Sequence, residues 1–369
     1  MKMLWMSPCF AIALVLSLGF AACVPAGDNP SGEPGEEKTA SPESADPQVA
    51  EADSGEEQLL RRESSAYKEL GLDRAEMGDL DELVERRVIR ALVTYSKTYY
   101  FLDGPKQRGV TYELFKLFED ELNKELGTGN LKVYVVLVPV SRDRLLPALT
   151  EGLGDIAAAG LTITPERQKL VDFSDPMLTG VKEIVVTGPT APALESLDDL
   201  AGQQIYVRQS SSYYQSLQEL NRTFERVGKP LMTLKPAEEY LEDEDLLEMV
   251  DTGLLPMVVV DEHKAEFWDQ IFENIALHPN LAVRDHGAIA WAFRKDSPRL
   301  AEAVNRFVAG HKKGTLMGNI LLKRYLKDTK YVTNALAGKD RERFDQTVGL
   351  FQKHAAQYGF DYLMMVAQG

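Results

Sequence analysis

The stretch "GDIAAAGLTITPERQKLVDFSDPM" (154–177) decides the fold of this chain. It opens with an apolar strand, expected over 154–160, directly after a helix that ends at Gly152. Strands that alternate with amphipathic helices predict a mainly parallel sheet with helices on both faces. The residues before this stretch alternate in the same way, with strands over 88–96 and 131–139 and helices over 111–126 and 141–152.

The alternation repeats after residue 200, and two extended segments, 182–189 and 287–295, flank the repeat. We expect these segments to connect two lobes, because they separate two similar blocks of strands and helices. The predicted fold class is α/β, a two-lobed clamshell of two mainly parallel sheets and two hinge strands, with a short incomplete α-helical segment at the C-terminal end. Ligands of such folds lie in the crevice at the carboxyl ends of the strands. The predicted boundaries are 81–186 and 286–330 for the first lobe and 187–285 for the second.

Composition excludes several classes of function. The net charge of −16 argues against nucleic-acid binding, which needs a basic surface. Much of the acid excess lies in residues 24–58, which hold ten acidic side chains and one lysine. Cys9 and Cys23 are the only cysteines, and the five histidines lack metal-ligand spacing. We therefore expect no disulfide framework, no metal and no cofactor.

The first 23 residues have the pattern of a secretory signal peptide, with an early lysine and an apolar run over 10–22. "FAAC" (20–23) resembles the lipobox of bacterial lipoproteins, which implies acylation of Cys23 and sorting to the outer membrane. An ordinary cleaved signal or an uncleaved anchor stays open. Residues 24–80 are predicted to be a disordered acidic linker and lead-in. The protein would then lie on the periplasmic face of the cell envelope.

Three segments in order along the chain carry a resemblance to a known family. They are the opening stretch (154–177), "VRQSSSYYQSL" (207–217) and "VVVDEHKAEF" (258–267). Together they resemble family 3 periplasmic solute-binding proteins, which bind amino acids and similar solutes.

The resemblance implies a site for a ligand carboxylate. Arg167 matches the arginine that clamps this group, and a planar guanidinium suits a carboxylate bidentately. Thr162 matches a hydroxyl or backbone contact to the same ligand. Ser211 and Ser212 would hold the anion at the start of a helix. Alternatively, Arg167 pairs with a neighbouring acid and the serines only cap the helix.

The resemblance also implies a site for a ligand amine. Asp261 would receive the amine from the other lobe, although it could instead cap the next helix. Tyr99 or Tyr100 would supply an aromatic wall, and either is equally suited to the core. The acidic run "LEDEDLLEM" (241–249) is expected to be a solvated helix face.

The C-terminal part resembles a more specific group. "AIAWAFRKDSPRLAEAVNRFV" (288–308) resembles the binding domain of the membrane-bound lytic transglycosylase F family, in which a wall-cleaving domain follows. Residues 331–369 would be the start of that domain, truncated before the glutamate that serves as its acid and base. We therefore expect no catalytic residue and no transglycosylase activity from residues 1–369.

The predicted function is ligand binding by an envelope lipoprotein, the sensor half of a lytic transglycosylase F-like protein. Its partners would be an amino acid or a cell-wall peptide, the membrane through a lipid anchor, and peptidoglycan; we expect a monomer. Three alternatives stay open. The native product extends past Gly369 and is an active transglycosylase, or the chain is a receptor for an ABC amino-acid importer, or its cleft is degenerate and the domain is a scaffold.

Overall fold

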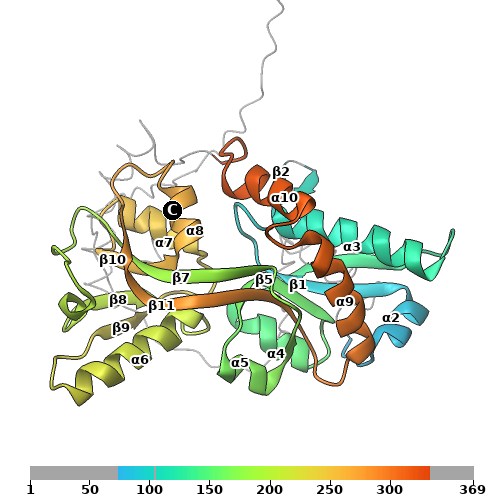
Figure 1. Cartoon of the computed structure of the whole chain (residues 1–369), viewed down its shortest axis with the longest axis horizontal. Coiled ribbons are helices and arrows are strands. Elements are labelled where there is room, and N and C mark those ends of the chain that lie inside the picture. The colour runs from blue at the N-terminus through green and yellow to red at the C-terminus, as the bar shows by residue number, and fades with distance from the viewer. Residues whose placement is uncertain (1–73, 104, 333–369) are drawn as a thin grey trace, which may run out of the picture. The chain divides into compact units, whose positions relative to one another are not determined.

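The computed structural model describes residues 74–103 and 105–332 (Figure 1). The helices are α2 (Leu80–Arg86), α3 (Val110–Leu126), α4 (Leu145–Thr150), α5 (Pro165–Leu170), α6 (Ser212–Arg226), α7 (Asp243–Asp251), α8 (Glu262–Trp268), α9 (Pro298–His311) and α10 (Leu316–Leu326), with 3-10 turns η1 (Arg142–Arg144) and η2 (Leu197–Leu200). The strands are β1 (Val88–Val93), β2 (Phe101–Asp103), β3 (Lys106–Arg108), β4 (Tyr134–Pro139), β5 (Ile156–Thr162), β6 (Asp172–Phe173), β7 (Leu178–Thr187), β8 (Gln204–Val207), β9 (Thr233–Pro236), β10 (Met257–Asp261) and β11 (Ala276–Phe293). The predicted signal peptide, Cys23, most of the linker and residues 333–369, nearly all of the segment predicted to be an incomplete domain, lie outside the described residues.

One seven-stranded mixed sheet runs through this part of the chain, in the order β10-β7-β11-β5-β1-β4, with β6 paired to β11. Strands β4, β1 and β5 are parallel, as the alternation of strands and helices predicts. The second block contributes a separate parallel pair, β8 and β9. Antiparallel pairing enters with β7, β10 and β11. The α/β fold class is confirmed.

Strands β7 and β11 run side by side across both halves of the described chain (Figure 1). The predicted crossing segment 287–295 is therefore only the end of an 18-residue strand. The pairing of β11 with β7 shifts register several times between His278 and Ala288. These irregularities expose polar residues in mid-strand and obscure the period-two pattern from which a strand is predicted.

Two lobes form around separate hydrophobic cores. The first lobe is the part of the chain that packs on β1, β4 and β5. The second lobe is the part that packs on β8, β9 and β10. In the first lobe, alternate residues of β1 enter different clusters: Ala91 and Val93 pack beneath α3 and α9, and Leu92 packs on α4. A sheet buried on both faces requires this alternation. The exact lobe boundaries remain a prediction.

A close backbone contact positions the loop after β1. Gly109 begins α3 with φ +115°, and a Cβ atom there would lie 2.2 Å from the carbonyl oxygen of Tyr99. The same carbonyl accepts a hydrogen bond of 2.9 Å from the amide of Thr111. Only glycine permits this approach, because any side chain would push the Tyr99 loop away from α3. Gly109 therefore fixes Tyr99, which lies at the contact between the lobes.

We predict that Gly109→Ala lowers the free energy of unfolding by about 3 kcal/mol, because it adds backbone strain and a steric clash. Urea denaturation followed by circular dichroism measures this loss. Gly127→Ala, at the other end of α3, is the matched control. Gly127 has φ +62° and its Cβ would meet no atom within 4 Å, so a loss of about 1 kcal/mol is expected. Equal losses for the two variants would show that the contact with Tyr99 is unimportant.

Candidate functional site

Arg167 lies where the two lobes meet. Thr164 caps α5 by accepting a hydrogen bond of 3.3 Å from the Arg167 amide, and Pro165 occupies the first helical position. This short helix turns the guanidinium back toward β5, where its Nη1 donates to the carbonyl oxygen of Thr162 at 2.8 Å. Its Nη2 donates to the carbonyl oxygen of Ser210, in the second lobe, also at 2.8 Å. Arg167 and Thr162 are thus brought together at the contact between the lobes.

The Arg167 guanidinium is a buried cation. It is 7% exposed, and burial together with the nearby charge of Arg142 lowers its pKa to about 10, so it stays protonated at neutral pH. Within the described residues no acidic side chain forms an ion pair with it, and its printed donors reach only backbone carbonyls. The structure therefore shows no pairing with Glu166 or Asp172.

The two serines lie at the first turn of α6. Ser211 is the N-cap, and its hydroxyl accepts from the Tyr214 amide at 3.2 Å and donates to the Arg208 carbonyl at 2.7 Å. Ser212 is buried, and its carbonyl oxygen accepts a hydrogen bond from Ser216. The hydroxyl of Ser211 is thus already engaged in capping the helix.

Asp261 ends β10 and is 1% exposed. Its side chain does not cap α8; Oδ2 lies 3.1 Å from the ammonium nitrogen of Lys264 instead. Its other oxygen, Oδ1, is buried and has no hydrogen-bond partner among the described residues. A buried acceptor without a donor costs about 1–3 kcal/mol, so this oxygen favours a ligand that donates to it.

Tyr99 and Tyr100 have different surroundings. The Tyr99 hydroxyl lies 3.1 Å from Nε2 of His263 in the second lobe, so this ring belongs to the contact between the lobes. Tyr100 is 4% exposed and packs in the core of the first lobe, where its ring stacks on Tyr95. Burial lowers the pKa of His263 to about 4, so this imidazole is neutral at pH 7.

The acidic run 241–249 is not the solvated face that the sequence predicts. Glu242, Asp243 and Glu244 are 5%, 1% and 4% exposed. The prediction is wrong because Glu242 and Asp243 pair with cations of other elements and Glu244 accepts from the Lys97 amide, which no local pattern reveals. Within this run the helix α7 begins at Asp243, with Glu242 as its N-cap.

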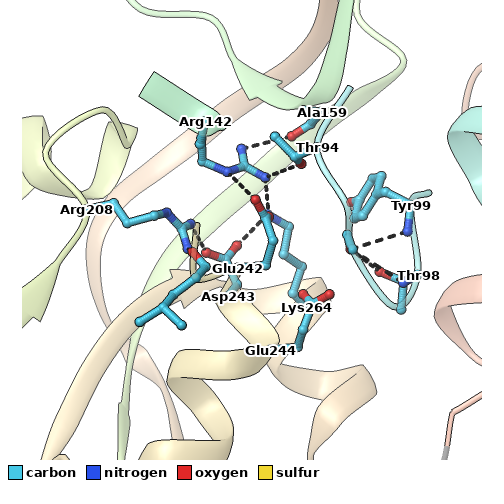
Figure 2. A network of polar contacts seen from close by, with 12 residues as sticks. Thr94, Thr98, Tyr99, Arg142, Ala159, Arg208, Glu242, Asp243, Glu244 and Lys264 are labelled. Atoms are coloured by element: carbon cyan, nitrogen blue, oxygen red, sulfur yellow. Dashed lines mark hydrogen bonds and ion pairs between the residues drawn. The ribbon is translucent and has the colours of Figure 1, made fainter. Parts of the chain in front are cut away.

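Arg142 and the acidic run join the two lobes (Figure 2). Arg142, which follows β4 in the first lobe, is directed at Glu242 and donates to it from Nε at 3.0 Å and also from Nη2. Nη1 of the same guanidinium donates to the carbonyl oxygen of Ala159 at 3.0 Å. Burial alone would lower the pKa of Arg142, but the charges of Glu242 and Asp243 raise it above its ordinary value. The Arg142 guanidinium therefore carries its positive charge into the contact with Glu242.

Asp243 binds two cations of the second lobe. Its Oδ1 accepts from Arg208, and its Oδ2 accepts from Lys264 at 2.6 Å (Figure 2). Burial would raise the pKa of Asp243, but the charges of Lys264, Arg208 and Arg142 outweigh burial and hold the pKa well below its usual range. Sequence reasoning missed these residues, although Arg142 follows the carboxyl end of β4, where such folds place ligand contacts.

The structure also contains an apolar cavity of about 60 Å³ in the first lobe. Its walls come from α3, α10, β5 and β11, and Tyr99 lines one side. In the described part of the chain, no group of three or more His, Cys, Asp or Glu side chains is arranged to hold a metal ion. The same residues include no helix with the length and apolar character needed to cross a membrane. The buried charged residues Arg167 and Asp261 do not line this cavity.

Comparison with known proteins identifies the family. Residues 92–327, more than half of the chain, match the bacterial extracellular solute-binding proteins, family 3. The chain belongs to this family. Among solved structures, it superposes on an ancestral amino acid-binding protein, a precursor of cyclohexadienyl dehydratase, with TM-score 0.55 and 25% identity over 67% of this chain and 99% of that one. An ancestral arginine-binding protein bound to arginine gives TM-score 0.51 at 24% identity over 64% and 97% of the two chains, which shows the shared two-lobed fold.

Several proteins with similar sequences are membrane-bound lytic murein transglycosylases F. The membrane-bound lytic murein transglycosylase F of Pseudomonas fluorescens is 27% identical over 79% of this chain and 57% of its own length. That of Desulfosudis oleivorans is 26% identical over 80% of this chain and 62% of its own length. The chain thus spans about three fifths of the length of these relatives, and it resembles them across both lobes.

Glu244 makes the contact between the lobes sensitive to pH. Its Oε1 accepts a hydrogen bond of 2.6 Å from the Lys97 amide across the lobes. Burial, and then the charges of Glu242 and Asp245, raise its pKa from the ordinary 4.5 to about 7. An acid whose pKa is raised by folding disfavours the folded state once it ionises. This contribution is absent below pH 4.5 and complete above pH 7.

We predict that Glu244→Gln stabilises the protein by up to about 3 kcal/mol at pH 8 and changes stability little at pH 4.5. The amide keeps the acceptor for Lys97 and removes the charge. Thermal unfolding of both proteins across this pH range measures the difference. Glu85→Gln removes an exposed charge from α2 and should give no pH-dependent difference. A Glu244→Gln effect that is constant with pH would contradict the assignment.

Proposed function

We propose that this family 3 protein binds an amino-acid-like or muropeptide-like ligand between its lobes and reports that ligand as the sensor half of a lytic transglycosylase F-like protein. The ligand would enter while the lobes are apart and be held when they close. In this proposal the two lobes provide a binding step that a wall-cleaving domain can respond to.

The proposal rests on the burial, charge and missing acidic partner of Arg167. Its guanidinium is buried, charged at neutral pH and without an acidic partner in the described part of the chain. A buried cation without a counter-ion is costly, so such a group is favoured only when a ligand supplies the negative charge. A carboxylate can accept two parallel hydrogen bonds from a guanidinium, which also fixes its orientation.

The surrounding groups support a ligand that touches both lobes. Thr162 and Arg167 belong to the first lobe, and Ser210, Ser211 and Asp261 belong to the second. Asp261 keeps an unpartnered oxygen for a donor from the ligand. A molecule with a carboxylate and a neighbouring nitrogen, as in an amino acid or the end of a peptide, has both required features.

The location we propose is the periplasmic face of the envelope, with acylated Cys23 as a lipid anchor in the outer membrane. The lipobox-like sequence and the name of the membrane-bound relatives support it. Similarity over about 80% of the chain to transglycosylase F proteins favours the sensor role over that of an importer receptor. A permease gene beside this one would favour the importer role instead.

We predict that Arg167→Ala weakens binding of the best ligand about 100-fold, because it removes two charge-assisted hydrogen bonds. Isothermal titration calorimetry of the purified protein against amino acids and cell-wall peptides measures this change. Arg167→Lys keeps the charge without the bidentate geometry, so it should bind with intermediate affinity.

The control is Arg144→Ala, which removes an exposed arginine of the same lobe that pairs with Glu151. This variant should bind as the wild type does. Unchanged affinity in Arg167→Ala would remove Arg167 from the site. If the wild type binds no compound of either class, the scaffold alternative is favoured.

A further inference from the structure

The second lobe contains an ammonium group of its own where a ligand amine is expected. Lys264 lies one turn after Asp261, on α8, and is 6% exposed. Its Nζ is 2.6 Å from Oδ2 of Asp243, 3.1 Å from Oδ2 of Asp261 and 3.3 Å from the hydroxyl of Tyr213. Two carboxylates and a hydroxyl thus surround this one cation.

Aromatic rings complete the surroundings of this ammonium. Nζ of Lys264 lies 5.7 Å from the ring centroid of Tyr99, in the first lobe, and 5.9 Å from that of Tyr213. Carboxylates and aromatic faces together are the groups that proteins use to bind the ammonium of a ligand. Here a side chain of the protein occupies that environment, and Tyr99 contacts it from the opposite lobe.

Most of the buried cations between the lobes have an acidic partner, whereas Arg167 forms no ion pair within the described residues. Three other cations each have an acidic partner: Arg142 with Glu242, Arg208 with Asp243, and Arg284 with Glu183. Lys264 neutralises Asp261, so the carboxylate that the family resemblance assigns to a ligand amine already has a counter-ion. A ligand carboxylate can therefore pair with Arg167, whereas a ligand ammonium at Asp261 would compete with Lys264.

One carboxylate oxygen of Asp261 can still accept a hydrogen bond from a ligand. Its Oδ1 is buried and has no hydrogen-bond donor among the described residues. A neutral N–H group can donate to this oxygen without bringing a charge close to Lys264. A protonated amine at the same place would be repelled by the Lys264 ammonium.

We propose that Lys264 takes the place of the ligand ammonium, so that the cleft selects a carboxylate whose neighbouring nitrogen is acylated and neutral. The inference rests on the proposed role of Arg167 in binding the carboxylate. The ligand class is then an N-acylated amino acid, with its carboxylate on Arg167 and its amide N–H on Oδ1 of Asp261. Lys264 acts as a specificity-determining residue that disfavours free amino acids.

The test compares matched ligands in calorimetry on the full chain. The probes are alanine, leucine and glutamate, each as the free amino acid and as its N-acetyl derivative. We expect the wild type to bind at least one N-acetyl compound at least tenfold more tightly than its free form. Lys264→Met keeps the unbranched apolar stem and removes the charge, and it should shift the preference at least tenfold toward the free amino acid.

Two further variants serve as controls. Lys264→Arg keeps a positive charge and should retain the preference for N-acetyl compounds. Lys229→Met removes a lysine that pairs with Asp198 elsewhere in the second lobe and should change nothing. If Lys264→Met does not fold, the wild-type comparison and Lys264→Arg still decide the question.

Each outcome has a separate meaning. Equal or tighter binding of the free amino acids by the wild type overturns the role of Lys264 and leaves the proposed binding function intact. An unchanged preference in a folded Lys264→Met protein does the same. If neither form of any probe binds, although cell-wall peptides do, this ligand class is wrong. Absence of binding by every compound overturns the proposed function as well.

Discussion

The contact between the two lobes depends on matching charges that have left water. An ion buried without a partner costs several kcal/mol, whereas a well-formed pair roughly offsets that cost. Arg142 can be buried only because Glu242 meets it from the other lobe, and Asp243 only because Arg208 and Lys264 share it. Such pairs add little net stability, but they disfavour every arrangement in which the partners are not aligned. They therefore determine the relative orientation of the lobes more than the strength of the contact between them.

This need for charge pairing explains which charged groups of the candidate site are left for a ligand. Glu242, Asp243 and Asp261 pair with cations of the protein, whereas Arg167 forms no ion pair among the described residues. The backbone carbonyls of Thr162 and Ser210 hold its guanidinium without neutralising it. The sheet supplies the positions, because β4, β5 and β10 all end where the lobes meet, and the helical turns that follow them carry Arg142, Arg167 and Lys264.

The sequence predicts the fold well wherever the signal is local. The alternation of strands and helices predicts β1, β4 and β5 in parallel, as the structure shows. The length of β11 could not be predicted, because its register shifts break the pattern of alternation. The burial of Glu242 could not be predicted either, because its partner Arg142 is 100 residues away in the chain.

Some residues of the candidate site can likewise be predicted from local sequence, and others depend on distant contacts. Arg167 and Asp261 follow strand ends and are recognisable from the motifs that contain them. Tyr99 and Tyr100 are adjacent and chemically identical, and only the contact of the loop with Gly109 decides which ring faces the second lobe. Lys264 resembles an ordinary surface lysine on a short helix. Its significance depends on Asp243, 21 residues earlier, and on a ring from the other lobe.

The paired strands β7 and β11 also determine how the lobes can move. Two hydrogen-bonded strands form a ribbon that bends and twists easily across its thin dimension and resists sliding along its length. Its register shifts, between His278 and Ala288, interrupt the ladder in the middle, so bending there breaks few hydrogen bonds. The two strands therefore allow bending between the lobes more readily than sliding. If the lobes close on a ligand as proposed, a bend at these shifts would rotate one lobe against the other, and a domain attached to one lobe would turn with it.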